Sequence, residues 1–302
     1  MLPYGGIVME KFQFKRNRLG LGPSWNEKEW YFIGAFDLTA NVYISFFIFR
    51  HMVKDSFVLK ILDLNSKALH LEEFEGVLCE HPGDNMDVSL PWNKKNMCRF
   101  YGTREDGWHF NFSSSEVNVA LEIKPEAPLF QRHENNFECI HHFFLDMHAR
   151  TSGVISIGNK QYSLNNAFSN LGHTFGRVLR KTSWHWLIVQ NDDFAFYSLI
   201  NYAASGSKMT HVLFNNQWVR LNKLVDFEFY DDKWSLTSPD VDLKIHILAE
   251  HNAHKRIPPI FPIIDLVHKE YFVRVTGKIR INLTWFDVAE LHGTMEEHHG
   301  KW

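Results

Sequence analysis

Apolar and polar residues alternate along much of this chain. In residues 241–247 and 273–283, nearly every second side chain is apolar. A two-residue period is typical of β-strands with one buried face and one wet face. Short turn sequences, Gly158-Asn159 and Asp231-Asp232, separate such stretches and predict tight hairpins. Long amphipathic patterns are scarce, and the three prolines within residues 256–262 predict an irregular connection there.

Two aromatic-rich stretches, residues 29–34 and 46–50, predict a hairpin with a carboxylate at one end and a guanidinium at the other. The antiparallel register places Glu29 opposite Arg50, Trp30 opposite Phe49 and Phe32 opposite Phe47. Opposed cross-strand pairs fix register and stabilise a sheet. Glu29 and Arg50 are therefore expected to form a structural ion pair. The alternative is that they act as a catalytic acid and the group that tunes it.

Many short strands with closely spaced turns predict an all-β protein built from antiparallel barrels or sandwiches. The 302 residues suit two such units, which we expect over residues 1–170 and 171–302. Polar and small residues cluster in 165–176, which is the expected seam between them. One continuous double barrel with a large shared interface is the alternative.

Composition narrows the classes of function. Hydrophobic residues make up 45% of the chain and aromatic residues 15%, which favours large apolar surfaces or a greasy cavity. The net charge is −3 with no basic stripe, so nucleic acid is not an expected partner. Three cysteines, Cys79, Cys98 and Cys139, have no spacing that indicates a disulfide framework or a zinc site. Without a leader pattern or a long apolar run, the expected location is the cytoplasm, with no membrane span.

Six motifs follow one another along the chain: Glu-Trp-Tyr-Phe-x-Gly (29–34), Phe-Phe-Ile-Phe-Arg (46–50), Ile-Lys-Pro-Glu-Ala-Pro (123–128), Gly-Val-Ile-Ser-Ile-Gly-Asn-Lys-Gln-Tyr (153–162), His-Thr-Phe-Gly (173–176) and Trp-His-Trp-Leu-Ile-Val-Gln (184–190). In this order they resemble the hydroxyneurosporene synthase family, which includes carotenoid hydratases and AttH-like proteins. Together with the C-terminal Gly-Thr-Met-Glu-Glu-His-His-Gly-Lys-Trp, they extend the resemblance over residues 29 to 302.

The resemblance implies two lipocalin-like β-barrels packed together around an apolar pocket. Characterised members hydrate, cyclise or rearrange isoprenoid-like or polyketide-like substrates, with an Asp as the suggested acid in a Trp-x-Asp-His-x-Trp-Gly-like segment. Residues 167–176 are similar to that segment and keep His173 and Gly176. Asn170 or Gly172 stands where the family has its Asp, so this carboxylate is missing.

The expected site follows from these residues. His173 is the candidate acid or base, because an imidazole titrates near neutral pH; the alternative is a structural histidine. Glu297 is the candidate carboxylate, with Asp37, Asp146 and Glu290 as other acids to place. Aromatic and neighbouring side chains are expected to line the pocket, unless they are barrel core: Trp30, Phe168, Phe175, Trp184, His185, Trp186 and Tyr202.

No cofactor and no metal are expected. Glu296-Glu297-His298-His299 and His251-x-x-His254 contain metal-ligand types. On a strand, however, adjacent side chains point to opposite faces, so two ligands on one side need a third from elsewhere. The expected function is binding of a hydrophobic small molecule, with hydratase, cyclase or isomerase activity on it. A non-catalytic lipid or isoprenoid carrier, which the missing Asp favours, and a structural β-module are the alternatives.

Overall fold

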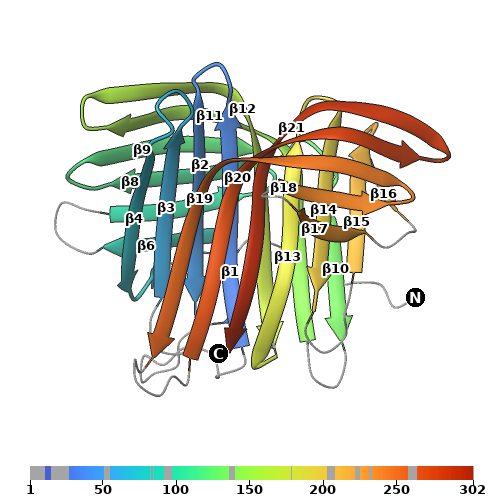
Figure 1. Cartoon of the computed structure of the whole chain (residues 1–302). Coiled ribbons are helices and arrows are strands. Elements are labelled where there is room, and N and C mark those ends of the chain that lie inside the picture. The colour runs from blue at the N-terminus through green and yellow to red at the C-terminus, as the bar shows by residue number, and fades with distance from the viewer. Residues whose placement is uncertain are drawn as a thin grey trace. The chain divides into compact units, whose positions relative to one another are not determined.

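The structure is a computed structural model that describes residues 11–14, 27–50, 55–81, 83, 85–91, 97–135, 140–177, 179–202, 208–221, 225–230, 233–257 and 264–301. All regular structure in these residues is β, in two separate sheets (Figure 1). The all-β prediction is therefore confirmed. None of the described segments forms a helix that is long and apolar enough to span a membrane.

The first sheet follows the order β4-β3-β2-β1-β12-β11-β9-β8-β7-β6-β5, and β10 also pairs with β11. Its strands are β1 (Glu27–Asp37), β2 (Val42–Arg50), β3 (Asp55–Asp63), β4 (Leu69–Gly76), β5 (Cys79–Glu80), β6 (Met86–Pro91), β7 (Met97–Thr103), β8 (Gly107–Ser113), β9 (Val117–Lys124), β10 (Phe130–Asn135), β11 (Ile140–Ile157) and β12 (Lys160–Arg177).

The second sheet follows the order β16-β15-β14-β13-β21-β20-β19-β18-β17. Its strands are β13 (Lys181–Gln190), β14 (Phe194–Asn201), β15 (Lys208–Phe214), β16 (Gln217–Arg220), β17 (Asp226–Tyr230), β18 (Lys233–Ser238), β19 (Val241–Ile257), β20 (Ile264–Ile281) and β21 (Thr284–Lys301).

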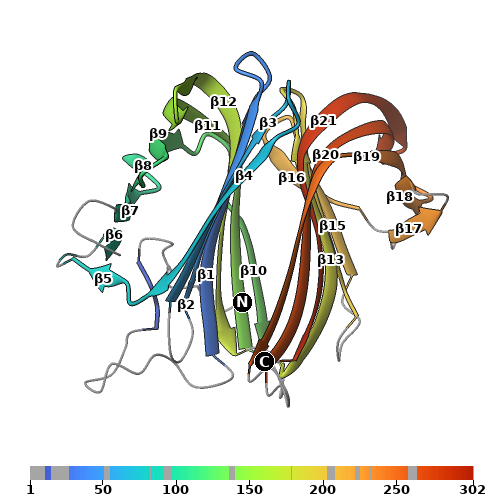
Figure 2. The ribbon, with the colours of Figure 1, turned by 60° about the vertical axis from the view of Figure 1, so that its left-hand side comes forward.

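The first sheet curls into a half-barrel whose concave face holds the core. Phe46 on β2 and Phe110 on β8 stack with ring centroids 3.7 Å apart, although β1, β12, β11 and β9 lie between them in the sheet order. Figure 2 shows this curl: the sheet bends so that β5 to β9 face β1 to β4. Phe57 also stacks on Phe110, at 5.9 Å. The middle of this interior is therefore filled by aromatic side chains, which pack at near-crystalline density in protein cores.

The second sheet curls similarly around its own core. Leu187 on β13 and Leu236 on β18 belong to one buried cluster, although three strands separate β13 from β18 in the sheet order. The predicted alternation is confirmed in β19, where Val241, Leu243 and Ile245 are buried and the residues between them are exposed. Tight strand contact requires glycine in β20: Gly277 has φ +143°, and a Cβ there would lie 2.1 Å from the Asp242 carbonyl oxygen.

The hairpin register predicted for the N-terminal aromatic stretches is confirmed. β1 and β2 pair Glu29 with Arg50, Trp30 with Phe49 and Phe32 with Phe47. The predicted ion pair between Glu29 and Arg50 does not form, so that prediction is wrong: each charged group has other partners. Glu29 binds His173, and Arg50 pairs with Glu80 and Asp55.

The turns and boundaries follow the sequence only partly. The hairpin at Gly158 is confirmed between β11 and β12, with Gly158 at φ +55°. The segment 165–176, expected as a seam, instead lies inside the continuous strand β12 (Lys160–Arg177). Contacts group β12 with the first sheet through Gly176, and the second unit takes up the chain from Arg177. Asp231, Asp232 and the prolines of 258–262 lie outside the described residues, whereas Arg256 belongs to β19.

Candidate functional site

A buried histidine–carboxylate pair lies on the concave face of the first sheet. Nε2 of His173 on β12 is 2.9 Å from Oε1 of Glu29 on β1, and both side chains have no exposed surface. Two backbone N–H groups also donate to this carboxylate: Gln13 N to Oε1 at 2.7 Å, and Phe14 N to Oε2 at 2.9 Å. An ionised carboxylate only accepts hydrogen bonds. Three donors on Glu29 therefore fit an ionised carboxylate, with Nε2 of His173 as one of the donors.

The other ring nitrogen of His173 is left without a partner. Nδ1 is buried and accepts no hydrogen bond from the described residues. The ring stacks on Tyr31 at a centroid distance of 4.0 Å and lies 5.1 Å from the ring of Phe175 and 6.1 Å from that of Phe144. A buried polar atom without a hydrogen bond costs free energy. An imidazole lone pair held among aromatic rings is thus available to a ligand that brings a proton donor.

A second charged group flanks this pair at the same end of the interior. Arg50 is 1% exposed; its Nη1 donates to the Phe14 carbonyl oxygen at 2.8 Å and also to Glu80. Its guanidinium lies 4.1 Å from the ring centre of Phe12, and the Phe12 ring packs edge-on against Tyr31 at 5.3 Å. The short segment 12–14 thus connects Arg50 to the Glu29–His173 pair.

A hollow of about 250 Å³ lies beside this segment. Phe12, Met86 and Val88 give it apolar walls, and Lys11 and Glu80 are among its charged lining residues. Pockets for drug-sized ligands usually measure about 300–1,000 Å³. The hollow is therefore small and of mixed polarity, and Phe12 stands between it and Tyr31.

The predicted lining residues of the first sheet divide between two places. Phe175 belongs to the His173 surroundings and also stacks on His142 at 4.6 Å. Phe168 lies elsewhere: its ring stacks on Phe36 at 5.4 Å and lies 4.0 Å from the Arg150 guanidinium. Trp30 is half-buried, with the Phe49 ring at 6.0 Å. Of the three, Phe175 alone contacts the candidate acid–base group.

The remaining predicted residues lie in the second unit, around the paired strands β13 and β21. Glu297, the second candidate catalytic residue, faces His185, with Nε2 of His185 3.9 Å from its Oε2. Tyr202 is 49% exposed, and its hydroxyl lies 3.0 Å from Nδ1 of His185. His173 lies in the first unit, where it contacts Glu29, and Glu297 lies in the second unit, where it faces His185.

The two tryptophans of β13 differ in their surroundings. Trp184 donates from Nε1 to Oε1 of Glu296 at 2.8 Å and stacks on His298 at 3.8 Å. Burial lowers the pKa of His298 well below its ordinary value. Trp186 is 8% exposed and therefore part of the buried interior.

The other candidate carboxylates are committed to structural contacts. Asp37 accepts from the backbone N–H groups of Thr39 and Ala40 in the β1–β2 turn. Glu290 is half-exposed and pairs with Arg274 at 3.2 Å. Asp146 is fully buried, and Arg104 donates to its Oδ1 at 2.9 Å. Burial nevertheless raises the pKa of Asp146 to about 6.

Sequence reasoning located both members of the pair but not their contact. The sequence predicts Glu29 as the partner of Arg50 and indicates His173 through its motif. No pattern signals that Glu29 and His173 meet, since 144 residues separate them. Tyr31 and Phe144, whose rings flank His173, were not candidates. Tyr31 was recoverable, because it lies two residues from Glu29 and so on the same face of the strand.

Comparisons with solved structures identify the architecture. An AttH-type protein of Nitrosomonas europaea superposes with a TM-score of 0.67 and 12% identity, over 96% of this chain and 97% of that one. The fold is AttH-like. Kievitone hydratase from Nectria haematococca gives a TM-score of 0.65 and 12% identity, over 92% and 90% of the two chains. CghA with Sch210972 gives 0.62 and 11%, over 91% and 88%. No family model and no curated protein matches the sequence.

Neither residue expected at the Asp position of the resembled motif supplies a carboxylate to His173. Gly172 has no side chain, and Asn170, 2% exposed, lies beside Gly34: the amide nitrogen of Asn170 would be 3.3 Å from a Cβ built there. The carboxylate next to His173 comes instead from Glu29 on β1. A histidine–carboxylate pair therefore exists here without the Asp of the motif.

Proposed function

We propose that this chain binds an apolar small molecule at the end of the first sheet's interior and transfers a proton to or from it through His173. The observation that carries the proposal is the buried Nδ1 of His173, which has no partner among the described residues while Glu29 holds Nε2. A positioned imidazole is the commonest general acid or base. The fold shared with kievitone hydratase and with CghA bound to Sch210972 supports a small-molecule substrate.

The arrangement suits an oxygen-bearing substrate. With the proton on Nε2, the lone pair of Nδ1 can take a proton from a hydroxyl group, and the Glu29 carboxylate then stabilises the resulting imidazolium. This is the orienting role that a carboxylate plays for histidine in acid–base sites. The imidazolium can return its proton to a carbonyl or alkoxide oxygen later in the reaction. It is too weak an acid for an unactivated alkene, so the proposed class is hydration or cyclisation at a carbon activated by oxygen.

The aromatic surroundings supply binding and a spectroscopic reporter. Tyr31 and Phe175 offer ring faces beside Nδ1. Trp108, fully buried, stacks on Phe100 at 5.3 Å, and Phe100 in turn lies 5.6 Å from Tyr31. A ligand that displaces Phe12 from Tyr31 therefore reaches a chain of rings that ends in tryptophan. Its binding should quench tryptophan fluorescence.

The test is a panel of apolar compounds that includes kievitone, Sch210972, isoprenoids and polyketides. Binding is followed by tryptophan quenching and turnover by mass spectrometry, where hydration adds the mass of water and cyclisation leaves the mass unchanged. His173→Gln should bind a substrate but not convert it, because glutamine keeps a donor for Glu29 and loses the basic nitrogen. The matched control is His142→Gln, since His142 also stacks on Phe175 but has no carboxylate partner among the described residues. Equal turnover in His173→Gln and the wild type would exclude proton transfer by His173.

A non-catalytic carrier is the second candidate, because no carboxylate is present in residues 167–176. A carrier would quench tryptophan fluorescence with a ligand of the panel and return that ligand unchanged. In that case His173→Gln would alter affinity alone.

A further inference from the structure

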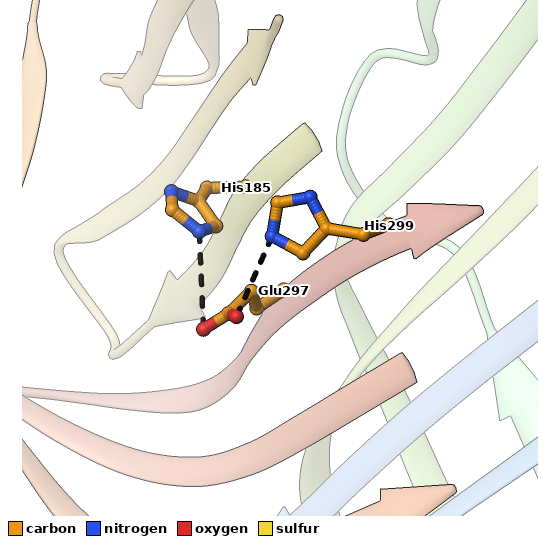
Figure 3. A group of neighbouring side chains, drawn as sticks. All are labelled: His185, Glu297 and His299. Atoms are coloured by element: carbon orange, nitrogen blue, oxygen red, sulfur yellow. Dashed lines mark ion pairs between the residues drawn. The ribbon is translucent and has the colours of Figure 1, made fainter. Parts of the chain in front are cut away.

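We propose a divalent-cation site of the zinc class in the second unit, formed by His185 on β13 and by Glu297 and His299 on β21. The site is independent of His173 and of the function proposed above. One ligand atom from each of the three residues lies within 4.8 Å of those of the other two. Figure 3 shows both imidazole rings directed at the two oxygens of the one carboxylate.

The distances suit a small cation. Nε2 of His185 is 3.9 Å from Oε2 of Glu297, and Nε2 of His299 is 3.5 Å from Oε1. In a tetrahedral zinc site the nitrogen and oxygen ligands lie about 2.0–2.1 Å from the metal, which sets neighbouring ligand atoms roughly 3.4 Å apart. The three side chains therefore need only small rotations to enclose an ion.

The second nitrogen of each histidine is held in the manner of a metal ligand. Nδ1 of His185 is 3.0 Å from the hydroxyl of Tyr202, and Nδ1 of His299 is 2.7 Å from the hydroxyl of Ser183. Metal-binding histidines usually hydrogen-bond through the ring nitrogen that does not face the metal, and this fixes the ring orientation. Here two such contacts leave both Nε2 atoms facing Glu297.

The backbone makes the cluster rigid and open. β13 and β21 pair His185 with Glu297 and Ser183 with His299, so ligands and hydroxyl come from one stretch of ladder. His299 is 51% exposed, whereas His185 and Glu297 are each 15% exposed. An ion can enter from the His299 side and keep water in its fourth position, as three-ligand zinc sites do.

One neighbour opposes the ion. Nζ of Lys269 on β20 lies 3.1 Å from Oε1 of Glu297. Its ammonium pairs with the carboxylate oxygen that the cation would bind. The Lys269 side chain is flexible and 36% exposed, so it can move into solvent. Lysine thus lowers the affinity of the site without blocking it.

The cluster on the opposite face of β21, His268 with Glu296 and His298, is less suited to a cation. Glu296 accepts from the Trp184 indole at 2.8 Å, and Nε2 of His298 is 3.0 Å from the Thr182 hydroxyl. Both side chains are almost fully buried, so an incoming ion would have to displace these contacts.

The test titrates the whole chain, treated with EDTA and dialysed, with Zn²⁺ in competition with a fluorescent chelator. We expect one ion per chain, and affinity lowered more than about 100-fold in His299→Ala and roughly tenfold in Tyr202→Phe. Lys269→Ala should raise the affinity. His254→Ala is the matched control, because His254 is an exposed histidine paired with the carboxylate of Asp265 at 2.7 Å; it should bind as the wild type does.

His299 is half-exposed, so its replacement should leave folding intact, which far-UV circular dichroism in EDTA checks. Co²⁺ adds a reading of geometry, since a four-coordinate ion absorbs visible light far more strongly than a hydrated one. Equal Zn²⁺ affinity in His299→Ala and the wild type would overturn the proposal. So would loss of binding in His268→Ala with retention in His299→Ala, which assigns the ion to the opposite face.

Discussion

The carboxylate of Glu29 meets the imidazole of His173 at 2.9 Å, with both side chains fully buried. Two backbone N–H groups complete the contacts of the carboxylate, and they belong to the segment that covers this end of the interior. The pair therefore joins β1, β12 and residues 12–14 in one network. Its members should depend on one another energetically.

Glu29→Gln should lower the free energy of unfolding by about 2–4 kcal/mol, because one carbonyl oxygen replaces a charged acceptor of three hydrogen bonds. Urea unfolding measures this loss. The double variant Glu29→Gln/His173→Gln should lose much less stability than the sum of the losses of the two single variants, because the two groups are in contact.

A second double-mutant cycle, with Glu29→Gln and Arg50→Met, tests whether Glu29 is coupled more strongly to His173 or to Arg50. Glu29 and Arg50 are opposed in the ladder, but each binds other groups. The coupling energy between Glu29 and His173 should exceed that between Glu29 and Arg50. A larger coupling energy between Glu29 and Arg50 would show that they form the cross-strand ion pair predicted from the sequence.

Arg50 should itself be a stability determinant. It is 1% exposed, and Asp55, 3.5 Å from its Nε, has no exposed surface. Arg50→Met removes the guanidinium beside this buried carboxylate and should cost about 3–5 kcal/mol. Arg99→Met is the control: Arg99 forms a two-pronged pair with Asp87 but is 40% exposed. Its loss should cost no more than about 1 kcal/mol. Similar losses in urea unfolding would contradict the difference in burial.

The sequence was sufficient for contacts within a hairpin and insufficient for contacts between distant strands. Alternation and aromatic content placed Glu29 opposite Arg50 correctly, because register depends on residues that are close in the chain. The Glu29–His173 contact depends on β1 lying beside β12, which no local pattern encodes. The expected ion pair failed because the neighbours that satisfy Glu29 and Arg50 come from residues 12–14 and β5.

The segment 165–176 shows a second reason. Small and polar residues there suggested a seam, yet Ser169, Asn170 and Thr174 are buried within β12. Every residue from 169 to 176 is buried, so side chains on both faces of this stretch are covered and its polarity does not indicate exposure. In β21, by contrast, the expected alternation of Glu297 and His299 on one face held. The third member of their cluster, His185, comes from the paired strand β13.

Gly153 in β11 should be intolerant of any side chain. Its φ is +141°, and a Cβ there would lie 2.0 Å from the Ala120 carbonyl oxygen on β9. Gly153→Ala should cost more than about 3 kcal/mol, since it combines a strained backbone with a clash against the neighbouring strand. Gly158→Ala in the β11–β12 turn is the control, with φ +55° and nothing within 4 Å. It should cost roughly 1 kcal/mol, the price of a left-handed residue alone. Equal losses in chemical denaturation would mean that β9 moves aside.

Asp146 should make stability depend on pH in a direction opposite to that of most carboxylates. Burial raises its pKa to about 6, and its Oδ2 has no hydrogen-bond partner among the described residues. In the unfolded chain the group titrates near pH 4. Between about pH 4 and 6 the folded protein therefore holds a proton at Asp146 that the unfolded chain has lost, so this group's contribution to stability falls as the pH rises through that window.

The measurement compares the wild type with Asp146→Asn, which cannot titrate, by urea unfolding from pH 7 to about pH 3. The free energy of unfolding of the wild type relative to the variant should increase by up to about 3 kcal/mol as the pH falls, because a shift of two pKa units corresponds to that energy. Asp87→Asn should show the opposite pH dependence of stability. Its hydrogen bond with Arg99 lowers the pKa of Asp87, so the wild type should lose its advantage over this variant as the pH falls below about 4. A flat difference for Asp146→Asn would mean that Arg104 compensates the buried charge completely.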